Sequence, residues 1–284
     1  MVEAPNALAV LQDGRFLIAD PIGNQLLYFN AAGELLNTVQ LDKLGIQNVL
    51  DMSVRDGDVY LLETSYQNYQ VHHLTQDGTL LSSEKFSSLF PVDDRGYTLE
   101  NVLMGIAVDC DGNVLLNLKS GREFYPLAWV QNHSDLAGAP EGFSCSNQTY
   151  RVSQLIPPRI SSAYQTYETS LTTQLGSLRV LDIFQDGSIY LIRSDLMSEQ
   201  PGSARDLTVH YIDGSGTVQG AARMPVSDEF FQPARSLAVG PDGEVYMLLP
   251  RLNGMEVLRL NFYTSLEPLQ PGAALPQVTV VPVP

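Results

Sequence analysis

Positive charge is scarce in this sequence of 284 residues. Lysine and arginine together number 16 against 32 aspartate and glutamate residues, which gives a formal net charge of −16 at pH 7. The lysines, Lys43, Lys85 and Lys119, are far apart, so no polybasic segment offsets the overall charge. Because such a protein repels phosphate backbones and anionic lipid head groups, we expect no nucleic-acid partner.

Long hydrophobic runs and cysteines are also few. A membrane-spanning helix needs a run of about 18 or more apolar residues, and none is present, so we expect no membrane insertion. The two cysteines, Cys110 and Cys145, fit either two reduced thiols or one disulfide. Two Asn-X-Ser/Thr triplets begin at Asn132 and Asn147, in the same region. These features do not determine the cellular compartment, but they slightly favour an extracytoplasmic or secreted location over the cytoplasm.

An internal repeat organises the chain. Five segments combine an apolar stretch, an Asp-Gly pair and a second apolar stretch. Asp-Gly between two β-rich runs indicates a hairpin, because glycine tolerates the positive φ of the turn and aspartate bonds the local backbone. The first halves of the repeats read ALAVLQDG (7–14), LDMSVRDG (50–57), GIAVDCDG (105–112), VLDIFQDG (180–187) and SLAVGPDG (236–243).

A second hairpin follows where the pattern is cleanest, as in NQLLYFNAAGELLNTV (24–39), so each repeat predicts four antiparallel strands. One such sheet cannot cover both of its apolar faces, and stacking the repeats around an axis would bury them. We therefore predict an all-β chain forming one β-propeller domain, with five blades counted and room for a sixth in residues 123–178. The predicted blades are 5–41, 48–87, 102–160, 178–225 and 234–268, and the tail 269–284 would close the ring.

Residues 7–40 resemble an NHL-type propeller repeat. The stretch ALAVLQDGRFLIADPIGNQLLYFNAAGELLNTV has the small-apolar strand, the Asp-Gly turn, the strand ending in Ala-Asp, the Asn, the aromatic strand and the glycine hairpin of that pattern. The repeats at 105–118 and 236–249 keep the opening of the pattern but not its Ala-Asp ending. The resemblance implies the propeller architecture rather than a particular activity.

Loops that join the second strand to the third are expected to gather at one mouth of the propeller channel, where ligands commonly bind. Asp20, Glu63 and Arg193 share a register, six residues after the repeat glycine, and are expected to converge there. Such a group can hold a polar ligand or a cation, and a structural salt bridge is the alternative reading. The predicted ligand-binding residues are Asp20, Asn24, Glu63, Tyr66, Tyr69, Arg122, Arg193 and Arg251.

Aromatic residues in or beside these loops, Tyr66, Tyr69, Tyr97, Phe230 and Phe231, suggest a contact surface for a protein, peptide or carbohydrate. Packing of long loops over the blades would explain them equally.

The leading functional hypothesis is a non-catalytic binding propeller, since the sequence contains no nucleophile elbow, phosphate loop or Cys-x-x-Cys zinc pattern. The alternative is a metal-dependent hydrolase similar to the gluconolactonase propellers, with a cation held by Asp20, Glu63 and Asn117 or Asn24. No cofactor is predicted under the first hypothesis, and a divalent cation such as calcium at the channel mouth belongs to the second. A purely structural blade array within a larger assembly is a third reading.

Overall fold

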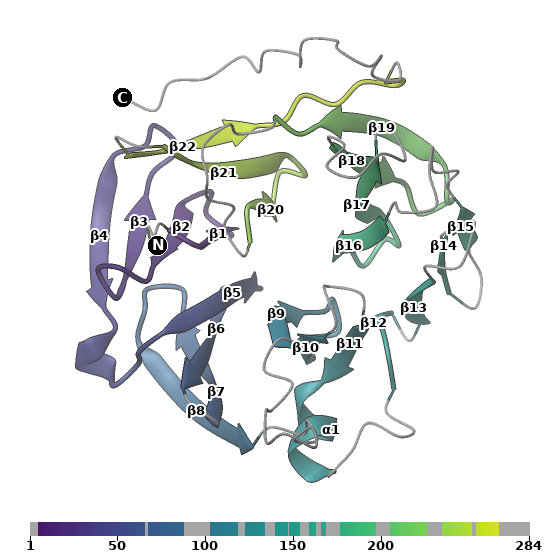
Figure 1. The fold of residues 1–284 in the computed structure, drawn as a ribbon. Helices are drawn as coiled ribbons and strands as arrows, with labels where there is room; N and C mark the ends of the chain where they lie inside the picture. The colour runs from purple at the N-terminus through teal and green to yellow at the C-terminus, as the bar shows by residue number, and fades with distance from the viewer. Residues whose placement is uncertain are drawn as a thin grey trace.

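Six small antiparallel sheets follow one another around a central axis and form a six-bladed β-propeller (Figure 1). In each sheet the strands are hydrogen-bonded in chain order. Four of the sheets have four strands and two have three within the part of the chain that is described. The computed structural model describes residues 5–65, 68–87, 103–118, 123–133, 140–146, 148–153, 159–162, 166–168, 177–196, 205–225, 235–251 and 254–266.

The first half of the ring contains three sheets. The first sheet comprises β1 (Ala7–Val10), β2 (Phe16–Asp20), β3 (Gln25–Phe29) and β4 (Leu35–Gln40), and a short 3-10 helix (Asp42–Leu44) follows it. The second comprises β5 (Val49–Arg55), β6 (Asp58–Ser65), β7 (Asn68–Thr75) and β8 (Leu80–Ser87). The third comprises β9 (Leu103–Val108), β10 (Val114–Leu118) and β11 (Glu123–Pro126), followed by helix α1 (Leu127–Asn132).

The second half contains the other three sheets. The fourth comprises β12 (Phe143–Cys145), β13 (Gln148–Ser153), β14 (Arg159–Ser161) and β15 (Thr166–Glu168). The fifth comprises β16 (Ser177–Ile183), β17 (Ile189–Leu196), β18 (Arg205–Ile212) and β19 (Val218–Arg223). The sixth comprises β20 (Leu237–Val239), β21 (Val245–Arg251) and β22 (Gly254–Arg259).

The predicted all-β propeller is therefore confirmed, and the number of blades is six. The fourth sheet lies inside residues 123–178, where the sequence left room for a further blade. The range 102–160, expected to form one blade, contains the whole third sheet and the beginning of the fourth. The tail 269–284 lies outside the described residues. No helix among the residues described is long and apolar enough to cross a membrane.

The Asp-Gly pairs form tight turns between the first two strands of five sheets. The five repeat glycines have φ between 77° and 87°, a region that residues with a side chain rarely adopt. The aspartate side chains fasten the turns: Asp13 Oδ1 accepts from the backbone N–H of Arg15 at 3.1 Å, and Asp186 Oδ1 from Ser188 at 2.9 Å. These turns lie at the end of the propeller toward which the innermost strands run.

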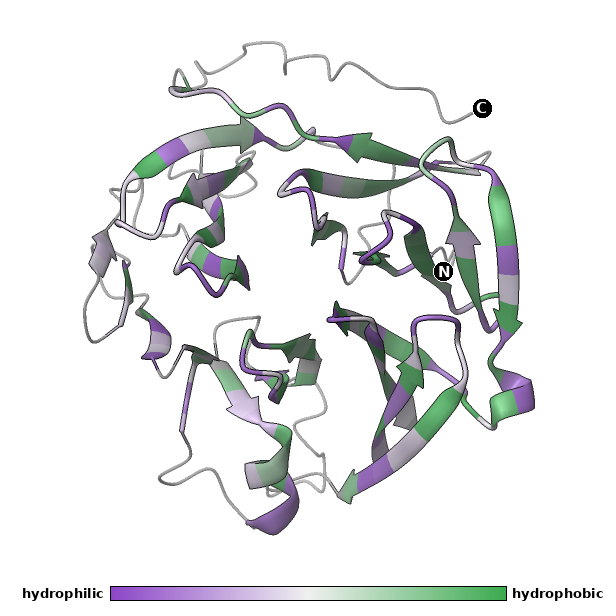
Figure 2. Cartoon of the chain, turned by 180° about the vertical axis from the view of Figure 1, so that it is seen from behind, coloured by the Kyte–Doolittle hydropathy of each residue, from purple (hydrophilic) through white to green (hydrophobic). Residues whose placement is uncertain are grey.

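The hydrophobic core lies between neighbouring sheets, because alternate residues of a strand face opposite blades. In β6, Val59 and Leu61 belong to the cluster shared with the first sheet, whereas Leu62 belongs to the cluster shared with the third. Figure 2 shows hydrophobic residues along the strands and hydrophilic ones at many of the turns. Each fully buried side chain of this kind contributes about 1.5–3 kcal/mol, so the stability is spread over the blade interfaces.

The ring closes where the first sheet meets the sixth. The backbone N–H of Leu8 donates to the carbonyl oxygen of Arg235 at 3.0 Å, and the N–H of Arg235 donates to that of Asn6 at 2.9 Å. Leu8 packs with Ala238 and Leu248 in a shared apolar cluster. The first and last blades are thus joined by backbone hydrogen bonds as well as by packing.

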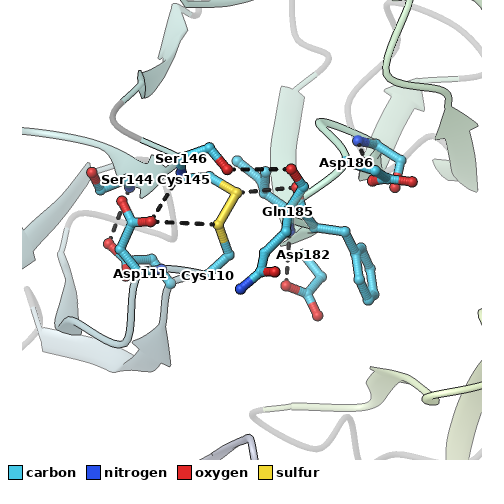
Figure 3. Close-up of a disulfide and its surroundings, with 12 residues drawn as sticks. Cys110, Asp111, Ser144, Cys145, Ser146, Asp182, Gln185 and Asp186 are labelled. Atoms are coloured by element: carbon cyan, nitrogen blue, oxygen red, sulfur yellow. Dashed lines mark hydrogen bonds between the residues drawn. A yellow bond between two sulfur atoms is a disulfide. The ribbon is translucent and has the colours of Figure 1, made fainter.

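A disulfide joins the third and fourth sheets (Figure 3). Cys110 lies in the turn after β9, Cys145 ends β12, and the two are 35 positions apart in the sequence. Asp111 Oδ1 accepts from the backbone N–H of Ser146 at 2.9 Å, and the Ser146 hydroxyl donates to the carbonyl oxygen of Gln185 in the fifth sheet at 3.2 Å. The short strand β12 is therefore fixed covalently and by hydrogen bonds to both neighbouring blades.

Candidate functional site

The loop residues predicted to bind a ligand are engaged in local structure in the first sheet. Asp20 accepts hydrogen bonds from the backbone N–H of Ile22 at 3.1 Å and from Gln25 Nε2 at 2.8 Å. Asn24 has φ of 46° and donates to the carbonyl oxygen of Ile46 at 3.0 Å. Both side chains thereby stabilise the turn between β2 and β3 and the connection to the next blade.

The predicted residues of the second sheet are buried. Glu63 is 7% exposed, and its Oε2 lies 2.7 Å from His72 Nε2. The other ring nitrogen of His72 lies 2.8 Å from Ser83 Oγ, so three adjacent strands are linked by one polar chain. Tyr69 is 5% exposed and stacks on Phe86 with ring centroids 5.6 Å apart.

The two predicted arginines that are described also have partners close in sequence. Arg193 Nη2 donates to Asp195 Oδ2 at 2.9 Å, and Arg251 Nη2 donates to Glu256 Oε2 at 3.0 Å. Tyr66 and Arg122 lie outside the described residues, as do Tyr97, Phe230 and Phe231. Among the described members of the predicted set, none bonds to another, and their role in ligand binding stays a prediction.

A different group of charged residues crosses the channel itself. Arg235, two residues before β20, donates from Nε and Nη2 to the two carboxylate oxygens of Asp51, each at 3.0 Å. Arg235 Nη2 also donates to the carbonyl oxygen of Ile106. Burial by itself would lower the pKa of Arg235, but the charge and hydrogen bonds of Asp51 outweigh it and raise the pKa. The pair therefore ties the second, third and sixth sheets together.

Asp51 also serves the edge of the third sheet. Its Oδ2 accepts from the backbone N–H of Ile106 at 2.9 Å, and two residues further on Ser53 Oγ accepts from the N–H of Val108 at 3.1 Å. The innermost strand of a blade has no neighbour on its channel side, so these side chains satisfy donors that would otherwise be unpaired. A Cβ at position 105 would overlap Asp51 Oδ2, which is held by Arg235 and the Ile106 N–H, so this contact favours glycine there.

A second arginine crosses the channel nearer the Asp-Gly turns. Arg55 Nη2 donates to Asp182 Oδ1 at 3.0 Å and to the carbonyl oxygen of Ile183 at 2.9 Å, and its Nε donates to the carbonyl oxygen of Asp109 at 3.3 Å. Burial raises the pKa of Asp182, although the charge of Arg55 opposes this. These contacts link the second, third and fifth sheets.

A cavity of about 120 Å³ lies beside Arg235, toward the end of the channel where the innermost strands begin. It is large enough to hold several water molecules. Its charged lining residues are Asp51, Arg179 and Arg235, its uncharged polar ones include Asn117 and Ser236, and its apolar wall contains Phe124, Phe143, Ile192, Met224 and Leu237. We refer to it as the Arg179 cavity.

Arg179 is the residue that distinguishes this cavity. It lies on β16 and, among the residues described, its guanidinium has neither a hydrogen bond nor an ion pair. Its surface is exposed to the cavity, yet it stands inside the ring of sheets. Burial lowers the pKa of Arg179, and the positive charge of Arg235 lowers it further. The site therefore holds a guanidinium whose donors have no partner in the described part of the chain, and such donors can bind an anion.

The opposite mouth of the channel is larger but electrostatically different. A cavity of about 330 Å³ lies among the Asp-Gly turns, with Gln12, Asp56 and Gln185 in its lining. The cation at this mouth, Arg55, already donates to Asp182 and two backbone carbonyl groups. Within the described part of the chain, the cation left without a partner inside the ring is thus at the Arg179 end.

The sequence contained a signal for these residues that the predicted set missed. The innermost strands are apolar, but LDMSVRDG carries Asp51 and Arg55, and SLRVLDIFQDG carries Arg179 and Asp182. A charged residue within an otherwise apolar strand that is buried on both sides needs a partner or a function. The charged residues that interrupt these apolar strands thus indicate the channel interior.

No group of three or more His, Cys, Asp or Glu residues that could hold a metal ion occurs within the ranges described. The cation ligands considered from the sequence include Asp20 and Glu63, which bond to Gln25 and His72 as stated above.

Comparisons with known proteins extend to the fold alone. No protein-family model matches the chain, and no curated protein matches it. Among solved structures, a streptogramin B lyase is 12% identical, with 92% of this chain and 94% of that chain covered and a TM-score of 0.44. A putative 6-phosphogluconolactonase from Bacteroides uniformis is 16% identical, covering 91% and 83%, with a TM-score of 0.43. A functionally unknown protein from Desulfotomaculum acetoxidans is 10% identical, covering 92% and 86%, with a TM-score of 0.47. Likeness at this level carries no argument about activity.

Proposed function

We propose that this protein is a non-catalytic binding propeller that takes an anionic group of its ligand into the Arg179 cavity. The ligand is a protein, peptide or carbohydrate that presents a carboxylate or a similar anion. One observation carries the proposal: the Arg179 guanidinium faces a cavity without a partner among the described residues, while the neighbouring Arg235 is held by Asp51.

The energetics of Arg179 support this reading. A cation inside a protein loses part of its hydration, and here it also stands near a second guanidinium, as the lowered pKa of Arg179 reflects. A bound carboxylate would replace the lost hydration by two parallel charge-assisted hydrogen bonds.

Titration with acetate, butyrate and phenylacetate tests the proposal, with calorimetry and thermal melting as readouts. We expect affinity to rise from acetate to phenylacetate, because the apolar wall can bury the larger group, and we expect Arg179→Gln to abolish binding. The matched controls are Arg193→Gln and Arg251→Gln. These arginines belong to the predicted loop residues at the channel mouth, here called the rim, and both already have carboxylate partners. Carboxylate binding that survives Arg179→Gln but is lost in a rim variant would overturn the proposal in favour of the loop residues.

The hydrolase hypothesis is tested by thermal melting in the presence of divalent cations. A channel cation site would make the melting temperature rise with calcium or manganese concentration by mass action. A rise that disappears in Asp20→Asn but not in Arg179→Gln would move the functional site to the rim and contradict the proposal.

We further propose an extracytoplasmic or secreted location. The support is the Cys110–Cys145 disulfide, since disulfides persist mainly in oxidising compartments. From the likeness of residues 7–40 to an NHL-type repeat, we also propose that this protein is related to the NHL-repeat propellers. The proposed location can be tested by alkylating the denatured, unreduced protein from its natural source and determining its mass. Two alkylated cysteines would show that the disulfide is not formed there and would contradict the proposed location.

A further inference from the structure

The Arg179 cavity has features that restrict its ligand more narrowly than a preference for anions. Its described charged groups are two arginines and one aspartate, so their formal charges sum to 2 − 1 = +1. A single carboxylate neutralises this charge. A dianion such as a phosphate monoester would leave an excess negative charge close to Asp51, so the cavity favours a monoanion.

A hydrogen-bond acceptor lines the same cavity as the guanidinium. Asn117, on β10, lines the cavity, and its Oδ1 is buried without a hydrogen-bond partner among the described residues. Buried polar atoms of this kind are nearly always paired in native proteins, and an unpaired one costs stability. A ligand with an N–H group would satisfy it.

The remaining wall is apolar. Phe124, Phe143, Ile192, Met224 and Leu237 come from four different sheets and line the same cavity as Arg179 and Asn117. Burial of an apolar group against them would add affinity in proportion to the area removed from water. The cavity thus offers a cationic donor, a neutral acceptor and an apolar surface within about 120 Å³.

Resting on the function proposed above, we propose that the ligand is the C-terminal end of a protein or peptide whose last residue has an apolar side chain. The terminal carboxylate binds Arg179, the amide N–H of the last residue donates to Asn117 Oδ1, and the side chain packs on the apolar wall. These three groups are attached to one Cα atom, which explains why one small cavity contains all three complementary features. The same groups occur in a free N-acylated amino acid, and the experiment separates the two sources.

The test uses short fluorescent peptides that end in leucine, measured by fluorescence anisotropy against the intact protein. We expect the free-acid peptide to bind at least about tenfold more tightly than its C-terminal amide, because the amide lacks the charge that pairs with Arg179. Arg179→Gln should remove this difference. Equal affinity of acid and amide would overturn the inference.

A depsipeptide, in which an ester replaces the last amide, removes the N–H without altering the protein. It should bind about tenfold more weakly than the parent peptide, as expected for a buried acceptor left unpaired. In Asn117→Leu the parent peptide and the depsipeptide should bind equally, with the melting temperature as the folding control. An unchanged affinity of the depsipeptide for the wild type would contradict the assigned role of Asn117.

The outcomes separate this inference from the proposed function. If phenylacetate binds and depends on Arg179 while peptide acids and amides bind equally, the function stands and the inference fails. If neither phenylacetate nor the peptides depend on Arg179, both fail. N-acetyl-leucine binding as tightly as the peptide would overturn the assignment to a chain end and point to a free N-acylated amino acid.

Discussion

Arg235 and Asp51, 184 positions apart in the sequence, form a two-point ion pair across the channel, with both N–O distances at 3.0 Å. The pair joins the last blade to the second, and Asp51 at the same time satisfies a backbone donor of the third. It therefore leaves Arg179 as the cation in this cavity without a partner among the described residues.

Removing the charge of Asp51 should destabilise the protein strongly. In Asp51→Asn the side chain can still accept from the Ile106 N–H, but Arg235 loses its counter-charge in a buried position. Breaking a buried pair from one side typically costs about 3–5 kcal/mol. Urea unfolding measures this cost. The control is Glu256→Gln, which breaks the exposed pair with Arg251 and should cost less than about 1 kcal/mol; equal effects of the two substitutions would refute the structural role of Asp51.

Gly105→Ala should be costly because of Asp51 and not because of backbone strain. The added Cβ would overlap Asp51 Oδ2, and forced overpacking typically costs about 1–3 kcal/mol. In an Asp51→Ala background the overlap is gone, so the further cost of Gly105→Ala should shrink. A double-mutant cycle from urea unfolding checks this coupling. Simple additivity of the two changes would show that the contact is not made.

The stability of the protein should fall with acid partly through His210. Burial lowers the pKa of His210 to about 4, the charge of Arg193 adds to this, and Asp206 opposes it. As the pH falls, this histidine binds a proton at a higher pH in the unfolded state than in the folded state. The contribution of neutral His210 to stability is therefore fully present above the unfolded pKa of 6.5 and is lost as the pH falls toward 4. His210→Gln should flatten this loss, by at most about 1.4 kcal/mol per pH unit.

Unfolding free energies of wild type and His210→Gln between these pH values test the prediction. His133→Gln is the matched control, since His133 is exposed, and it should follow the wild-type profile. Parallel profiles for His210→Gln and the wild type would show that His210 binds its proton equally in both states.

The disulfide should stabilise the junction of the third and fourth sheets. Closing a loop of this length is expected to contribute about 2–4 kcal/mol, and β12 has only 3 residues to hold the fourth sheet in place. Cys110→Ala with Cys145→Ala should lower the urea midpoint accordingly. Wild-type protein under reductant should behave like the double variant, and a midpoint unmoved by either treatment would contradict this role.

The sequence predicted the architecture because it is encoded locally. An Asp-Gly turn between two apolar stretches specifies a hairpin wherever it occurs, and five such turns define five blades. The remaining blade, the fourth sheet, lacks this signal: its first turn contains Ser146 with φ of 51° in place of Asp-Gly, and its first strand is short. Without the turn motif, the fourth sheet could be allowed for but not located.

The channel site could not be predicted in the same way, because it depends on ring closure. Arg235 meets Asp51 only after all six blades are stacked, and no local pattern encodes that encounter. The prediction of ligand-binding residues at the rim relied mainly on their equivalent positions in the repeats. Register correctly identifies equivalent positions, such as Asp20 and Glu63, but it does not reveal that each side chain has its partner nearby.

The binding of a heavy-atom carboxylate in crystals tests the central claim most directly. Crystals soaked in 4-iodobenzoate should show its carboxylate against the Arg179 guanidinium and the anomalous signal of iodine near the apolar wall, and crystals of Arg179→Gln should show neither. Arg179 paired instead with a carboxylate of the chain itself, or the compound bound only beside Arg193 or Arg251, would contradict the account.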